Sequence, residues 1–112
     1  MKIIISAQEP AFDGRVDQRF GRSPWLIFTD TNTGQWEALE NPGGGQSGGA
    51  GVAAAQFVID RQAEAVISGD FGPHAANALR AAKIDMYLFP AEIPSVRAAV
   101  EACVSGKLAL FA

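Results

Sequence analysis

The pattern of apolar and polar positions divides the chain into short strands and helices. Five runs rich in β-branched, aromatic and aliphatic residues predict strands. They cover residues 2–6, 25–30, 35–40, 65–68 and 84–89. Apolar residues at three- and four-residue spacing predict helices over residues 50–62, 73–82 and 94–105.

The order of these elements predicts how they are arranged. Thr31-Asn32-Thr33-Gly34 is typical of a turn, so the strands on either side of it are expected to form an antiparallel hairpin. Helices and strands alternate after the hairpin, as in sheets whose parallel strands are joined by helical crossovers. A mixed sheet with helices on its faces is therefore predicted. We find neither an internal repeat nor a linker, so residues 1–112 are expected to form a single domain.

Composition and charge exclude several classes of protein. The 112 residues are 48% hydrophobic and 19% charged, which is typical of a globular domain with one core. A net charge of −3 argues against a surface that attracts nucleic acid. No apolar stretch approaches the ~20 residues of a membrane-spanning helix, and the N-terminus is too poor in apolar residues for a signal peptide. A cytoplasmic location is predicted.

Cysteine and histidine each occur once, which limits the possible metal sites. A single cysteine, Cys103, excludes an intrachain disulfide and any site built from cysteine alone. One cysteine and one histidine also exclude a tetrahedral zinc site made only of these residues. Cys103 falls on the apolar stripe of the last predicted helix, so we expect it to be buried and unreactive.

The first candidate site is a glycine-rich loop at residues 41–51, which holds six of the twelve glycines. It leads directly into a predicted helix, whose first N–H groups and positive dipole end suit an anion. Glycines also let backbone N–H groups turn toward a ligand that approaches closely. The loop matches neither a Walker A motif, since no Lys-Ser or Lys-Thr pair follows, nor the strand context of a dinucleotide-binding motif. A flexible connection without a ligand is the alternative.

A second candidate is the arginine-rich loop of residues 13–24. Arg15, Arg19 and Arg22 lie within eight residues and could grip carboxylates or other oxyanions through their guanidinium groups. Asp13 and Asp17 lie among them, so a solvated loop whose charges pair with one another is the alternative.

A third candidate is the segment Ser68-Gly69-Asp70-Phe71-Gly72-Pro73-His74, which joins a strand to a helix. Open α/β sheets place ligands at such strand ends. His74 falls in the first helical turn, where the positive end of the helix favours a neutral ring that can bind a metal. A surface histidine without a ligand is the alternative. Both helix starts that follow these glycine motifs should lie at the same edge of the sheet, which would bring the loops into one pocket.

Together these motifs resemble the dinitrogenase iron–molybdenum cofactor biosynthesis family, which includes NifX, NafY and the C-terminal part of NifB. The resemblance covers nearly the whole chain and rests on the order and spacing of its motifs. They are the strand at residues 2–6, Arg19-Phe20-Gly21-Arg22-Ser23-Pro24, the glycine-rich loop from Asn41-Pro42 to Gly49-Ala50-Gly51, and Ser68-Gly69-Asp70-Phe71-Gly72-Pro73. The family implies a ribonuclease-H-like three-layer α/β fold, with a mixed five-stranded sheet containing one antiparallel strand and helices on both faces.

The resemblance implies binding, not catalysis. Similar proteins hold or carry the iron–molybdenum cofactor or its iron–sulfur precursor between donor and acceptor proteins of nitrogenase assembly. Such a cluster is anionic, so loop amides, arginines and an imidazole would complement it. The expected cofactor-binding residues are Arg19, Arg22, Asn41, Gly44, Gly45, Gly48, Gly49, Gly72 and His74, with His74 as the metal ligand. A monomer or a weak homodimer is expected.

The chain departs from the family's pattern in three places. Arg19 stands where many members have histidine, and Gln46 and Ser47 stand where histidine is frequent in the glycine-rich loop. His74 stands where many members have asparagine. Two common ligand positions are therefore lost and one is gained.

Two other functions stay open on the sequence. The glycine-rich loop could bind a small anion or a nucleotide without a metal. A ribonuclease-H-type enzyme with two metals would need several converging carboxylates. Asp30 and Asp70 end strands and could lie near each other, but Ser6 ends the first strand where an acid would be expected. A carrier of a metal cluster is the leading hypothesis.

Overall fold

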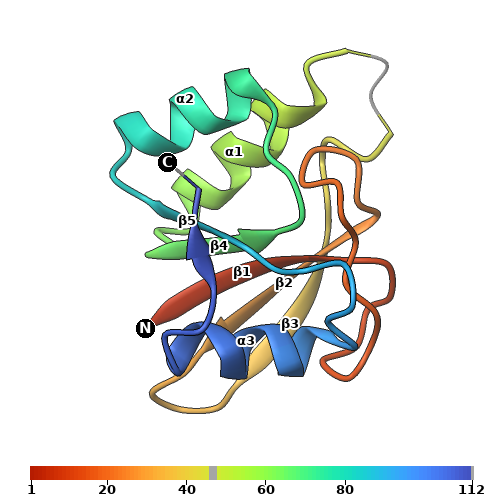
Figure 1. Ribbon diagram of the computed structural model, residues 1–112. Helices are drawn as coiled ribbons and strands as arrows, with labels where there is room; N and C mark the ends of the chain where they lie inside the picture. Colours follow the sequence, from red (N-terminus) through yellow and green to blue (C-terminus); the bar gives the residue numbers. More distant parts are fainter. Residues whose placement is uncertain (46–47, 112) are drawn as a thin grey trace.

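The computed structural model describes residues 1–45 and 48–111 (Figure 1). Gln46 and Ser47, at which the chain departs from the family's pattern, lie outside the described residues. Among the helices that are described, none is long and apolar enough to cross a membrane.

Six strands in the described part of the chain form one mixed sheet in the order β3-β2-β1-β4-β5-β6. The strands are β1 (Lys2–Ala7), β2 (Trp25–Asp30), β3 (Trp36–Glu40), β4 (Ala65–Ser68), β5 (Asp85–Leu88) and β6 (Ala109–Leu110). β1 pairs in parallel with β4, and β4 pairs in parallel with β5. β2 runs antiparallel to both β1 and β3, and β6 runs antiparallel to β5. The predicted hairpin of β2 and β3 is therefore confirmed.

The sheet corrects the expectation of five strands with one antiparallel strand. Over residues 1–45 and 48–111 it has six strands, of which β2 and β6 run against the others. β6 consists of Ala109 and Leu110, both exposed, and pairs with Tyr87 and Leu88 at the edge of the sheet. Two exposed residues carry no periodic apolar pattern, so the sequence does not reveal this strand.

Helices cover both faces of the sheet (Figure 1). α1 (Ala50–Asp60) and α2 (Pro73–Ala81) pack on one face, and α3 (Val96–Val104) packs on the other. In β1, Ile4 belongs to the core under α1 and α2, whereas Ile3 and Ile5 belong to the core under α3. A strand that is buried on both faces is apolar at successive positions, which explains the unbroken run of isoleucines.

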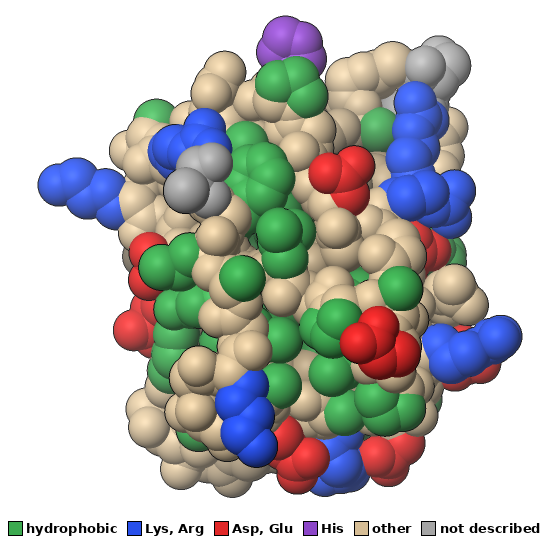
Figure 2. Space-filling model, in the orientation of Figure 1, with side chains coloured by type: hydrophobic (Ala, Val, Ile, Leu, Met, Phe, Trp, Pro, Cys, Tyr) green, Lys and Arg blue, Asp and Glu red, His purple; other side chains and the backbone are tan. Residues whose placement is uncertain are grey.

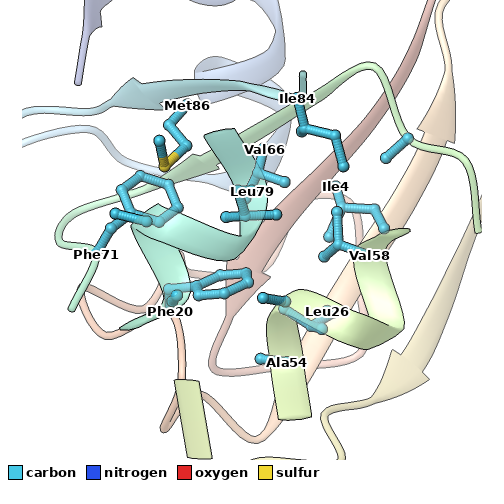
Figure 3. Packing of buried hydrophobic residues seen from close by; sticks show 14 residues of the cluster. Ile4, Phe20, Leu26, Ala54, Val58, Val66, Phe71, Leu79, Ile84 and Met86 are labelled. Carbon is cyan, nitrogen blue, oxygen red and sulfur yellow. The ribbon is translucent and has the colours of Figure 1, made fainter. Parts of the chain in front are cut away.

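The core under α1 and α2 also anchors two of the loops that carry the candidate motifs (Figure 3). Phe20 of the arginine-rich loop and Phe71, the residue after Asp70, are both buried in this core. Their ring centroids lie 5.3 Å apart. Burial of two large rings therefore fixes both loops at the same place beside the sheet.

Two helix boundaries differ by two residues from those predicted, each for a local reason. α1 ends at Asp60, before Gln62, whose φ of 58° leaves the right-handed helical region. α3 begins at Val96 and not at residue 94, because Ser95 caps the helix. The Ser95 hydroxyl accepts a hydrogen bond from the Ala98 N–H at 3.1 Å.

Cys103 is half-buried, which corrects the expectation that it is buried. It packs against the edge of the core under α3, and the next residue, Val104, is 62% exposed. The last turn of α3 thus extends past the part of the sheet that it covers. Burial raises the pKa of the Cys103 thiol, and the Asp85 carboxylate adds to the shift.

We expect Cys103 to react with a thiol reagent about tenfold more slowly in the folded protein than in guanidinium chloride, because its raised pKa leaves little thiolate at neutral pH. The rate should increase as the pH rises toward that pKa. The chain has one cysteine, so the absorbance of the released reagent anion reports on this residue alone. Equal rates in the native and unfolded chains would show that the fold does not protect the thiol.

Candidate functional site

Three loops meet at one end of the strands and line a pocket of about 340 Å³. They follow β1, β3 and β4, which run in the same direction and therefore end at the same edge. The pocket lies between the starts of α1 and α2, as the strand order predicted, and the arginine-rich loop lies beside it. Its lining residues are Arg19, Phe20, Gly21, Arg22, Gly49, Ala50, Gly51, Val52, Asp70, Gly72, Pro73, His74 and Ala75.

The helix ends at this pocket offer backbone donors. In α1 the Ala53 N–H donates to the Gly49 carbonyl, so the N–H groups of the residues between them point out of the helix end. In α2 the corresponding bond runs from the Ala76 N–H to the Gly72 carbonyl. Both N-cap residues are glycines, which have no side chain to occupy these donors. Each helix start therefore presents amide groups and the positive end of a dipole to the pocket, with the difference that Pro73, the first residue of α2, has no N–H.

The start of α3 differs, because the protein itself satisfies its donors. The Val96 N–H donates to the Gly14 carbonyl at 3.0 Å, and the Arg97 N–H donates to the Phe12 carbonyl at 2.9 Å. The Ser95 hydroxyl accepts a third N–H from the same turn. The helices that start at the pocket, α1 and α2, thus lack a side-chain cap, whereas α3, which starts elsewhere, has one.

Glycines allow the arginine-rich loop and the glycine-rich loop to touch along their backbones. A Cβ atom on Gly21 would lie 2.9 Å from the Gly51 Cα atom. A Cβ atom on Gly43 would lie 2.6 Å from the Gly21 carbonyl oxygen and would also collide with the Ala50 carbonyl. One on Gly51 would lie 3.3 Å from the Ala75 Cβ atom, where α1 and α2 approach each other. Packing against backbone therefore requires glycine at positions 21 and 43.

Asn41 fastens the glycine-rich loop to the arginine-rich loop. Its buried amide nitrogen donates to the Phe20 carbonyl at 3.0 Å and to the Ser23 hydroxyl at 3.1 Å. Its side-chain oxygen accepts the Gly43 N–H at 2.9 Å. All these partners belong to the protein, so the contacts of Asn41 are structural and it does not line the pocket.

Arg19 lies in the wall of the pocket with its guanidinium paired to Asp17. Its Nε and Nη2 atoms donate to the two carboxylate oxygens at 3.2 and 3.1 Å. The side-chain hydrogen bonds to Asp17 raise the pKa of the Arg19 guanidinium. Arg15 pairs with Glu9 at 3.7 Å, away from the pocket. Asp17 and Arg19 therefore pair inside the loop, and Arg19 still lies in the pocket wall.

His74 and Asp70 are exposed residues that line the pocket. Figure 2 shows the histidine projecting at the top of the molecule, basic side chains gathered at the upper right, and an acidic side chain between them. Within residues 1–45 and 48–111, no three histidine, cysteine, aspartate or glutamate side chains are grouped so that they could hold a metal ion. His74 would therefore act as a lone imidazole ligand to any metal in this pocket.

The structure brings five of the nine predicted binding residues into one pocket lining. They are Arg19, Arg22, Gly49, Gly72 and His74. The others, Asn41, Gly44, Gly45 and Gly48, are not in the lining. Gly45 and Gly48 are exposed, with open space where a Cβ atom would stand.

Eight of the thirteen lining residues were not predicted as site residues, among them Gly21, Gly51 and Asp70. Gly21 and Gly51 belong to the motifs that carry the family resemblance, but a sequence does not show which glycines of a loop face a pocket. Asp70 directly follows the loop glycine after β4, and that place at a strand end was the available signal.

The fold and this pocket define a three-layer α/β domain with an open, donor-lined site at one edge of its sheet. The family model described as dinitrogenase iron–molybdenum cofactor matches residues 1–106. The chain therefore belongs to this family, which associates it with that cofactor in an accessory role. No curated protein matches the chain.

Solved structures share this fold. The chain is similar to the orange protein from Desulfovibrio gigas, determined in its apo form, with 35% identity and a TM-score of 0.92 over 99% of this chain and 92% of that one. A Thermotoga protein of the DUF35 family, proposed to be a NifB protein, is 26% identical with a TM-score of 0.83, over 97% and 91% of the two chains. PH0822 shares the fold at 20% identity and a TM-score of 0.76, over 99% and 96% of the two chains.

Gly43→Ala is expected to lower the free energy of unfolding by about 1–3 kcal/mol, because the added methyl group has to displace the backbone of Gly21 or Ala50. Gly45→Ala is the matched control, since a Cβ atom there meets nothing within 4 Å. It should change the free energy of unfolding by less than about 1 kcal/mol. Urea unfolding of both variants measures the difference, and equal stabilities would contradict the need for close backbone contact.

Proposed function

We propose that the chain binds an anionic iron–sulfur or iron–molybdenum cluster, or a precursor of it, in this pocket and carries it as cargo, without catalysing a reaction. The observation that carries the proposal is the convergence of two uncapped helix starts and the Arg19 guanidinium on one pocket. Membership of the iron–molybdenum cofactor family supports the kind of ligand. Similarity to the orange protein, which was determined in an apo form, supports ligand binding by this fold. Residues 1–112 would act as a single cofactor-binding domain.

The donors of the pocket suit a cluster that brings most of its own ligands. Amide N–H groups and a guanidinium donate hydrogen bonds to sulfide or carboxylate groups, and helix starts favour negative charge. His74 offers one imidazole, whereas Cys103 packs on the opposite face of the sheet. A cluster here would be held by hydrogen bonds, by charge and by at most one metal–imidazole bond. The pocket volume of about 340 Å³ lies in the usual range for small ligands.

The positions of the carboxylates do not support a two-metal enzyme. Asp30 pairs in register with Lys2 at the start of β1, whereas Asp70 follows the end of β4. The two residues therefore lie at opposite ends of the strands, because β2 runs antiparallel to β1 and β1 runs parallel to β4. The expectation that Asp30 and Asp70 could lie close together is wrong.

The arrangement of the strands supports the ribonuclease-H-like fold that the family implies, with β6 as an addition at the edge. Among β1 to β5, only β2 runs against the others. In such a carrier the open pocket would let donor and acceptor proteins of nitrogenase assembly reach the cargo directly. The carrier would act in the cytoplasm as a monomer or a weak homodimer.

Tetrathiomolybdate, a coloured molybdenum–sulfide dianion, is a suitable probe of this pocket. We expect it to bind the folded protein, and His74→Ala and Arg19→Gln each to weaken its binding about five- to tenfold through loss of one polar contact. Asn77→Ala, an exposed position in α2, and Arg15→Gln, whose partner is Glu9, are matched controls and should bind like the wild type. Titration followed by visible absorbance measures these affinities.

Sulfate and a nucleoside triphosphate distinguish a cluster carrier from a simple anion or nucleotide site. Displacement of tetrathiomolybdate by either one at a similar concentration would favour the simple site and contradict the proposed cargo. A wild-type protein that binds none of the three would contradict both functions. If His74→Ala alone binds like the wild type, the histidine makes no contact with this anion.

A further inference from the structure

Asp17 is a buried carboxylate directly behind the wall of the pocket. Only 2% of the residue is exposed, and its oxygens accept hydrogen bonds from the backbone nitrogen, Nε and Nη2 of Arg19. Asp17 does not itself line the pocket. A buried carboxylate is destabilising unless it is paired in this way, so its position depends on the arginine beside it.

The backbone of Asp17 is tied to the centre of the sheet. Its N–H donates to the Ser6 carbonyl at 3.0 Å, and its carbonyl accepts the Ser6 hydroxyl at 2.7 Å. The Ser6 hydroxyl also shares a 2.7 Å hydrogen bond with the Ser68 hydroxyl. Both serines are fully buried, in β1 and β4, so the carboxylate is held by the two central strands of the sheet.

Arg19 is held on two sides but keeps donors for a ligand. Its backbone forms a bridge with Asp70, and Asp17 accepts one N–H from Nε and one from Nη2. A guanidinium has five N–H donors, so the other three stay available beyond this pair. The Arg19 side chain is 65% exposed and lines the pocket, where a ligand can reach these donors.

We propose that Asp17 is a positioning residue for the anion site: it aims the Arg19 guanidinium at the pocket and offsets its charge, so that Arg19 acts as a directed hydrogen-bond donor. This inference rests on the proposed function of the pocket. If Arg19 instead attracted the cargo by net charge, the carboxylate of Asp17 would oppose binding. The two views therefore predict opposite signs for the removal of the Asp17 charge.

The same part of the chain offers a matched control. Glu9 accepts the backbone N–H of Arg15 at 2.9 Å and lies 3.7 Å from the Arg15 Nε atom, which repeats the pattern of Asp17 and Arg19. This pair is exposed and does not line the pocket. Glu9→Gln and Asp17→Asn remove the same charge, and in both variants the amide oxygen can still accept the backbone N–H.

Titration with tetrathiomolybdate separates the two views. Asp17→Asn should raise the dissociation constant about tenfold, as expected when one charge-assisted donor loses its orientation, although the variant has one negative charge fewer. Glu9→Gln should stay within about twofold of the wild type. The proposal is wrong if Asp17→Asn binds as tightly as Glu9→Gln or more tightly than the wild type.

A double-mutant cycle shows whether Asp17 acts through Arg19. In the Arg19→Gln background, Asp17→Asn should cause no further loss of affinity. A further loss of similar size would mean that Asp17 supports the loop in general, which would also overturn the proposal. Thermal unfolding of each variant establishes that the affinities belong to folded protein.

A charge-conserving variant provides a test that does not need Asp17→Asn to fold. Arg19→Lys keeps the positive charge but lacks the planar guanidinium that Asp17 orients, so it should weaken binding about as much as Arg19→Gln. An Arg19→Lys variant that binds like the wild type would show that Arg19 works by net charge and would overturn the proposal.

The ligand-free protein separates failure of this inference from failure of the proposed function. In the wild type, the Arg19 Nε–H proton should exchange slowly with water in NMR spectra, because Asp17 accepts it; fast exchange would contradict the pairing. If that proton is protected and the wild type still binds no tetrathiomolybdate, the proposed function fails, and the role of Asp17 in an anion site fails with it.

Discussion

The pocket depends on three backbone segments that touch one another with no side chain between them. Gly21, Gly43 and Gly51 form this contact, and a Cβ atom on either of the first two would overlap the backbone of a neighbouring segment. Asn41 reinforces it with hydrogen bonds to both loops. This contact places the start of α1, with its donors, against the arginine-rich loop in the wall of the pocket. A larger residue at these positions would therefore change the geometry of the site as well as the stability of the fold.

Most of the fold could be predicted from the sequence because its elements have strong local patterns. The turn after β2, the three helices and the shared edge of the helix starts all follow from such patterns and from strand direction. β6 could not be predicted, since two exposed residues at a sheet edge have no pattern of their own. The start of α3 was misplaced because its cap, Ser95, lies inside a run that already has helical spacing.

Site residues could be predicted where their place at a helix start brings them to the pocket. They could not be predicted where their role depends on which charged side chain they pair with. Gly49, Gly72 and His74 lie at helix starts, so the sequence alone brings them to the pocket. The role of an arginine depends on which carboxylate it meets, and that is set by the folded chain. Asp13 illustrates the point, because it pairs with Arg97, 84 residues away, and not with an arginine of its own loop.

Opposite charges nearly balance around the pocket, and this bears on the proposed role as a carrier. Arg19 and Arg22 lie in its wall, Asp70 lies in the same wall, and Asp17 lies behind it. Long-range attraction of an anion would therefore be weak, and affinity would come from donors that act only at contact. Donors held in place before binding lose less conformational entropy when the ligand arrives, which is what the chain of hydrogen bonds from Ser6 through Asp17 to Arg19 provides. Ligation by several thiolates would hold a cluster more firmly, but a carrier has to release its cargo to another protein. A nearly neutral, preorganised set of hydrogen-bond donors with a single imidazole suits that requirement better than a complete set of metal ligands.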